Sequence, residues 1–97
     1  MDIDVSDNPA ELRYELRADG ELVGEIRYRR IPDGLALIHT QVEPRRTGLG
    51  SVLVQQALDD MRSRGLRLVP ICPFVRAYIK RHPEYEDLVT ADDAVPE

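Results

Sequence analysis

The sequence predicts one α/β domain with α+β character, in which a mixed sheet starts as an antiparallel meander of three strands. Three observations lead to this fold class. Apolar and polar residues alternate over 12–16 and in the second half of 22–29, residues 49–64 place apolar side chains at helical spacing, and residues 66–72 resemble a further strand. The expected order is therefore strand, strand, strand, helix, strand, helix.

Turn residues separate the three strands of the predicted meander. Residues 12–16 alternate and lead into Asp19-Gly20, a hairpin turn signal. Residues 22–29 alternate in their second half and are followed by Pro32-Asp33-Gly34, which predicts the next turn. Residues 35–42 begin apolar at every position, as expected of a central strand that is covered on two sides.

The second half of the chain predicts two helices with a strand between them. The first helix carries its apolar face on Leu49, Val52, Leu53, Ala57, Leu58 and Met61. Gly65 is typical of a helix C-terminus, and Pro70 predicts that the following strand lies at an edge or contains a bulge. Pro73 suits the first turn of a second helix over about 74–81, which ends before Pro83.

The size and composition of the chain limit the function classes. The 97 residues suffice for one core, expected over about 10–89 of a domain spanning 1–97, with an acidic tail at 90–97. The net charge of -5 argues against nucleic-acid binding, which depends on neutralising phosphates. No apolar run approaches the ~20 residues of a membrane span, and the N-terminus does not resemble a secretory signal. We expect a cytoplasmic protein, a monomer or weak dimer, that binds neither nucleic acid nor a membrane.

Cys72 is the single cysteine of the chain. It has no partner for an internal disulfide, and a structural zinc site is not expected without further cysteines. We therefore predict no metal.

The most informative segment is Val42-Glu43-Pro44-Arg45-Arg46-Thr47-Gly48-Leu49-Gly50, between a predicted strand and a predicted helix. Glycine lets the backbone approach a ligand closely, and the free N–H groups and positive dipole end of the helix favour phosphate. Arg45 and Arg46 add charged donors at the rim. The alternative is that the two glycines make a tight turn and let the helix pack closely on the sheet.

Within this segment, Arg45-Arg46-Thr47-Gly48-Leu49-Gly50 resembles the phosphate-binding motif of the GNAT superfamily of acetyltransferases. That motif reads Gln or Arg, two residues, Gly, one residue, then Gly or Ala. The segments Ile38-His39-Thr40-Gln41-Val42, Cys72-Pro73-Phe74-Val75 and His82-Pro83-Glu84-Tyr85, together with Tyr78, resemble a subgroup of very small GNAT-like proteins. The resemblance covers about 13–89.

The resemblance implies a truncated GNAT fold that binds acetyl-CoA as co-substrate. In that family the strands corresponding to 35–42 and 66–72 splay apart and the pantetheine arm lies between them. It follows that Gln41 and Val42 line the arm, and that backbone N–H groups of Arg46, Thr47, Gly48, Leu49 and Gly50 hold the pyrophosphate, with Arg45 beside them. Ordinary members have a strand and two helices before the meander, for which this chain has no room. We expect the acceptor side to be open or completed by a partner.

Three side chains are candidates for the acetyl-transfer chemistry. Cys72 lies where a strand leads into a helix, whose N-terminus favours a thiolate, although a free cysteine is often a small buried hydrophobe. Tyr78 is the nearest match to the tyrosine that protonates the departing thiolate in the family, with packing on the sheet as its alternative. His39 is a candidate general base or a hydrogen-bonded structural residue, and Glu43 is a further candidate base.

Together with the resemblance, these residues predict an N-acetyltransferase that transfers the acetyl group of acetyl-CoA to an unidentified amine, on a small molecule or a protein, with Cys72 as the candidate relay. One alternative is a non-catalytic module that binds or senses acyl-CoA and docks to a partner protein. Another is an interaction domain without a ligand, in which the glycine turn is coincidental.

Overall fold

The computed structural model describes residues 2–44 and 48–90. The elements are β1 (Ile3–Asn8), β2 (Arg13–Ala18), β3 (Glu21–Ile31), β4 (Gly34–Val42), α1 (Leu49–Ser63), β5 (Arg67–Pro70), α2 (Pro73–Arg81) and the 3₁₀ helix η1 (Pro83–Leu88). The predicted α+β fold class, with its mixed sheet and antiparallel meander, is confirmed.

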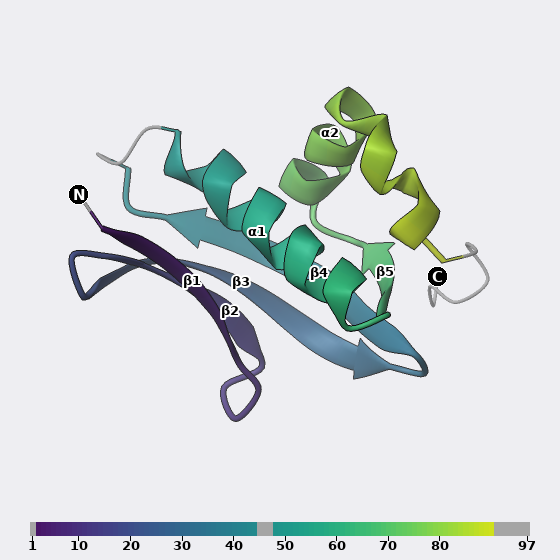
Figure 1. Ribbon diagram of the computed structural model, residues 1–97, viewed down its shortest axis with the longest axis horizontal. Coiled ribbons are helices and arrows are strands. Elements are labelled where there is room, and N and C mark those ends of the chain that lie inside the picture. Colours follow the sequence, from purple (N-terminus) through teal and green to yellow (C-terminus); the bar gives the residue numbers. More distant parts are fainter. Residues whose placement is uncertain (1, 45–47, 91–97) are drawn as a thin grey trace.

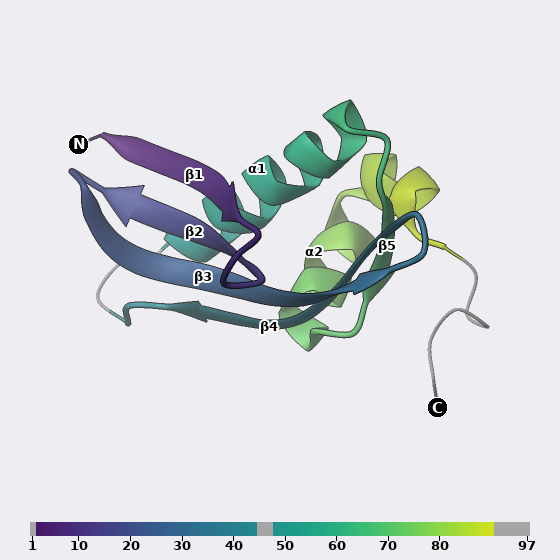
Figure 2. The ribbon, with the colours of Figure 1, turned by 90° about the horizontal axis from the view of Figure 1, so that it is seen from below.

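The strands form one sheet in the order β1-β2-β3-β4-β5. Neighbours from β1 to β4 are antiparallel, and β5 is parallel to β4. Pro70 therefore lies in an edge strand, as its missing N–H predicts. Helices α1 and α2 lie on the same face of the sheet (Figure 1), and in the described part of the chain no helix covers the other face (Figure 2).

The sequence interpretation missed β1. This strand pairs along its whole length with β2, from Ile3 opposite Ala18 to Asn8 opposite Arg13. Ordinary members of the resembled family have a strand and two helices before the meander, and this chain was expected to have no room for any of the three. That expectation is wrong for the strand, because β1 is present. A turn over residues 9–12, closed by the Glu11 N–H donating to the Asn8 carbonyl (3.1 Å), connects β1 directly to β2.

The hydrophobic core lies between the covered face of the sheet and the two helices. Its fully buried side chains come from every layer and include Tyr14, Leu16, Ile26, Leu37, Leu53, Leu58, Met61, Leu68 and Val75. At the edge of this core, two tyrosine hydroxyls donate hydrogen bonds to carboxylates. Tyr14 donates to Asp60 of α1 (2.7 Å), and Tyr28 donates to Asp7 of β1 (2.6 Å). These bonds tie the helix and the edge strand to the central strands.

A network of ion pairs lies on the uncovered face of the sheet, around Glu15 of β2. Glu15 is only 4% exposed, and it accepts hydrogen bonds from Arg13, Arg17 and Asn8. The Arg13 guanidinium is the main reason that the pKa of Glu15 is lowered, and it overcomes the opposing effect of burial. A buried carboxylate with several charged or amide donors is stable without a covering layer, so this face needs no helix above it.

Candidate active site

The edge of β4 is paired with β5 along only part of its length. The parallel pairing runs from Gly34 opposite Arg67 to Leu37 opposite Pro70, whereas β4 continues to Val42. The backbone turns away at this point, because the N–H groups of Ile71 and Cys72 both donate to the Leu37 carbonyl (3.0 and 2.9 Å). Beyond Leu37, β4 therefore has β3 as its one strand partner among the described residues.

The N-terminus of α1 follows the end of β4 and faces outward. Gly48 is its N-cap, with φ 84° in the left-handed region and open space where a Cβ would stand. The next residue, Leu49, is buried at 8% exposure and anchors the helix start in the core. The first turn carries no acidic side chain, so no carboxylate of that turn opposes the binding of an anion at its N–H groups and dipole. The predicted binding residues Arg45, Arg46 and Thr47 lie outside the described residues.

Gly50 has a different local role from Gly48. A Cβ on Gly50 would stand 3.0 Å from the end of the Phe74 ring in the first turn of α2. Phe74 itself is 38% exposed. The second glycine of the motif thus lets the two helices approach each other at their N-terminal ends, as the close-packing alternative predicted, although its neighbour is α2 and not the sheet.

Cys72 is the N-cap residue of α2 and is buried at 3% exposure. Its Sγ lies 3.4 Å from the Oγ1 of Thr40, which belongs to the part of β4 that pairs with β3 but not with β5. Burial acts to raise the pKa of this thiol, but hydrogen bonds from the Thr40 side chain and from backbone groups of Val75, Phe74 and Thr40 outweigh it, and the pKa is lowered. The surroundings of the sulfur therefore favour a thiolate.

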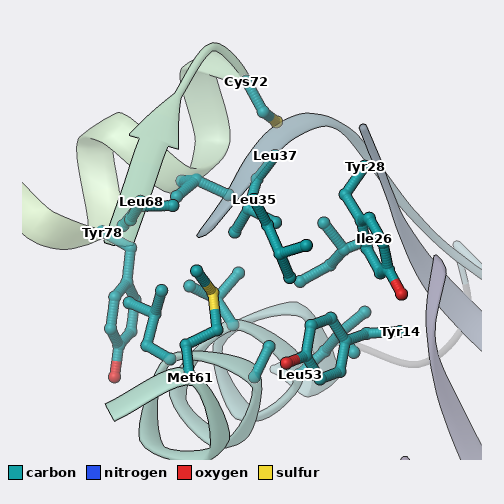
Figure 3. Packing of buried hydrophobic residues seen from close by; sticks show 14 of the residues in the cluster. Tyr14, Ile26, Tyr28, Leu35, Leu37, Leu53, Met61, Leu68, Cys72 and Tyr78 are labelled. Atoms are coloured by element: carbon teal, nitrogen blue, oxygen red, sulfur yellow. The ribbon is translucent and has the colours of Figure 1, made fainter. Parts of the chain in front are cut away.

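Tyr78 lies apart from the thiol. Its ring stacks on His82 at 4.2 Å between centroids and is tilted against Tyr85 at 6.0 Å. Figure 3 shows the hydroxyl directed away from Cys72. Burial, with the nearby carboxylates of Asp59 and Glu84, raises the pKa of the phenol. This placement favours the packing alternative, and the structure does not bring the two candidate residues together.

The remaining predicted residues of β4 lie on both faces of the strand. His39 and Gln41 are exposed on the uncovered face, opposite Arg27 and Glu25 of β3. Val42 pairs with Gly24, where its Cγ2 would stand 3.1 Å from an added Cβ. Because successive side chains alternate, His39 points away from the face that carries Thr40 and Cys72.

A depression of about 470 Å³ lies at the end of the sheet, between the start of β3 and the end of β4. It is lined by residues 22–25 and 41–44, so it includes Gln41 and Val42. It lies on the β3 side of β4, whereas the resemblance implied that the arm runs on the β5 side. Gln41 and Val42, which were predicted to line the arm on the β5 side of β4, therefore also border this depression on the β3 side.

Sequence reasoning missed two residues of this region as individual contributors. Thr40 contacts the thiol, and Phe74 fills the space above Gly50. The glycine in the first turn of the predicted helix was the sequence signal for a close neighbour such as Phe74. The contact of Thr40 with Cys72 joins residues 32 positions apart and leaves no local pattern in the sequence.

Two further findings concern metals and membranes. Across residues 2–44 and 48–90, no three or more His, Cys, Asp or Glu side chains come together in a way that would hold a metal ion. Within the same ranges, none of the helices combines the length and apolar character needed to cross a membrane.

Comparisons with known proteins identify a family and similar folds for this chain. A family model described as GCN5-related N-acetyl-transferase matches residues 13–88. The solution structure of a GCN5-like protein from Staphylococcus aureus aligns with a TM-score of 0.68 and 18% identity, over 91% of this chain and 88% of the other. A ribosomal-protein-alanine N-acetyltransferase from Brucella melitensis biovar Abortus 2308 aligns with a TM-score of 0.54 and 23% identity, over 84% of this chain and 63% of the other. A comparison with curated proteins finds no match. At these identities the solved structures show a shared fold.

Proposed function

The chain belongs to the GCN5-related N-acetyl-transferase family, and from this membership we propose that it binds acetyl-CoA and transfers the acetyl group to an amine. The family assignment confirms the resemblance noted on the glycine motif at 45–50. The observation that carries the proposal is the early end of the β4–β5 pairing, with the Cys72 thiol at the point of divergence.

The described residues are compatible with the binding of both the pyrophosphate and the pantetheine arm of acetyl-CoA. A helix start with glycine at its N-cap suits the pyrophosphate, because Gly48 makes no side-chain cap hydrogen bond and, among the residues that the structure describes, nothing stands where its Cβ would be. The unpaired edge of β4 after Leu37 offers backbone groups to the pantetheine amides. In this proposal Gln41 and Val42 line the arm, and Arg45, Arg46 and Thr47 contribute to the phosphate end.

We assign Cys72 the role of acetyl relay. Its thiolate attacks the thioester carbonyl, a new carbon–sulfur bond forms to the protein, and CoA leaves as a thiolate that takes up a proton. The amine then attacks the acetyl-cysteine, the carbon–sulfur bond breaks, and the amine loses its proton as the amide forms. The lowered thiol pKa and the hydrogen-bond donors around the sulfur support this role.

The proposal is tested by binding and by mass. Acetyl-CoA should raise the melting temperature in a concentration-dependent way, because a ligand that binds only the folded state stabilises it. Intact-mass spectrometry after incubation should show one acetyl group, located on Cys72 by peptide mapping. Absence of any thermal shift at millimolar acetyl-CoA would contradict the proposed binding, and acetylation of Lys80 alone would contradict the relay.

A second candidate function is a non-catalytic module that binds acyl-CoA and docks to a partner protein. One observation favours it: β1 and β2 are joined by a short turn, so no helical wall stands over the uncovered face in the described chain. Saturable acetyl-CoA binding, without a mass gain and without CoA release in the presence of a range of amines, would support the module instead of the enzyme.

A further inference from the structure

Thr40 contributes a hydrogen bond to the candidate nucleophile, and the proposal above gives this residue no individual role in the chemistry. Its Oγ1 lies 3.4 Å from the Sγ of Cys72, and the two residues belong to segments that have already parted, β4 after Leu37 and the chain after Pro70. The contact therefore bridges the point of divergence between the two strands.

The position of Thr40 is fixed independently of the cysteine. Antiparallel pairing places Thr40 opposite Ile26 of β3, which is fully buried. A β-branched side chain on a strand has few accessible χ1 rotamers, so its Oγ1 is held near the sulfur, and rotation of the hydroxyl hydrogen alone turns it into a donor. A donor atom that is already in position costs little reorganisation when negative charge develops.

The hydroxyl completes a set of donors around one atom. Backbone groups of Phe74 and Val75, in the first turn of α2, and of Thr40 itself also act on the sulfur. The largest effects on the pKa of this thiol come from burial and from these hydrogen bonds, and none of these effects comes from a charged side chain. The nearby titratable candidates do not substitute for Thr40, because His39 lies on the other face of β4 and the hydroxyl of Tyr78 is directed away.

We propose that Thr40 is a positioning residue that donates its hydroxyl to the Cys72 thiolate and so sets the reactivity of this sulfur. The role rests on the proposed function for its biological meaning, but the chemistry it predicts belongs to the protein without acetyl-CoA. Without the hydroxyl, a nearly buried sulfur loses its one side-chain donor among the described residues and becomes harder to ionise.

The thiolate absorbance of Cys72 in the ultraviolet, followed against pH in the free protein, tests this inference. Subtracting the same titration of Cys72→Ser removes the tyrosine signal. Thr40→Val keeps the shape and removes the hydroxyl, and it should raise the midpoint by about one unit, a roughly tenfold smaller thiolate fraction at neutral pH. Thr40→Ser, which keeps the hydroxyl, should stay near the parent, as should Thr90→Val, a matched loss of a hydroxyl far from the sulfur.

The outcomes separate this inference from the proposed function. A folded Thr40→Val with the parent midpoint, or a Thr40→Ser shifted as far as Thr40→Val, would overturn the role of the hydroxyl even if acetyl transfer were observed. If Thr40→Val does not fold, Thr40→Ala provides the same comparison. A raised midpoint in the valine variant, together with no acetylation of the parent, would retain the inference and contradict the relay alone.

Discussion

Helices α1 and α2 both follow a strand and both begin without a capping side-chain hydrogen bond, yet their first turns have opposite surroundings. The start of α1 is an exposed glycine with open space around it. The start of α2 is a nearly buried cysteine whose sulfur is surrounded by hydrogen-bond donors. The free N–H groups of a helix start can bind an external anion or stabilise an internal one, and accessibility decides which.

This difference suggests that binding and chemistry are divided between the two helix starts. In the proposed function, the α1 start would offer its dipole to a ligand phosphate, and the α2 start would offer its dipole to the Cys72 thiolate. The two starts also touch, since the Phe74 ring lies against Gly50. If the division holds, variants at one start should change binding and variants at the other should change reactivity.

The largest effect is expected from Cys72→Ser. Serine has nearly the same size, but its hydroxyl is hardly ionised at neutral pH, so acetyl transfer to an amine should fall by about a hundredfold or more. Affinity for acetyl-CoA, measured by calorimetry, should remain within about twofold. Full turnover in this variant would contradict the proposed division of binding and chemistry between the two helix starts. It would favour direct transfer, with Tyr78 as the next residue to change.

An intermediate effect is expected from Gly48→Val, for which the chain contains a matched control. Gly20 has nearly the same φ (85° against 84°) and also has open space at its Cβ position. Valine at either site is strained and should cost about 1–2 kcal/mol of stability. Affinity for CoA should fall more than about tenfold for Gly48→Val only, because a side chain there blocks approach to the helix start.

If folded Gly48→Val and Gly20→Val bind CoA equally well, the prediction that the α1 start belongs to the binding site is contradicted. A loss of affinity in both variants would mean that calorimetry is reporting stability and not the site.

The smallest effect is expected at the contact between the two starts. Gly50→Ala favours the helix by roughly 0.5–1 kcal/mol, but its Cβ meets the Phe74 ring, so the net change in the parent should be near zero. In a Phe74→Leu background the gain should appear, giving a coupling of about 0.5–1 kcal/mol in urea unfolding. The same gain in both backgrounds would show that the helix starts are independent.

Much of the fold could be predicted because its signals are local. The turn signal at Asp19-Gly20, the alternation over 12–16 and the apolar stripe of 49–61 are each formed by residues near one another in the chain, and each predicted a feature that the structure contains. Strand β1 was missed because Ile3 and Val5 are a weak pattern among polar residues. They become a strand by pairing with β2, which is a contact between separate segments.

The candidate site divides in the same way. The motif at 48–50 and the position of Cys72 before a helix could be identified from the residues themselves. The direction of the Tyr78 hydroxyl could not, since it depends on how α2 rotates against α1 and η1. A helix period states which face is apolar, but the depth and neighbours of one ring follow from packing.

The sequence by itself determined the fold class, the family and the two helix starts, because turn chemistry, side-chain periodicity and the glycine motif act over short stretches of chain. Only the tertiary structure decided that Thr40 meets Cys72, that Gly50 faces Phe74 and not the sheet, and that His39 lies on the uncovered face away from the thiol. These contacts depend on the register of β4 against β3 and on the point where β5 leaves β4. Both are set by the joint packing of segments distant in sequence, which no local pattern encodes.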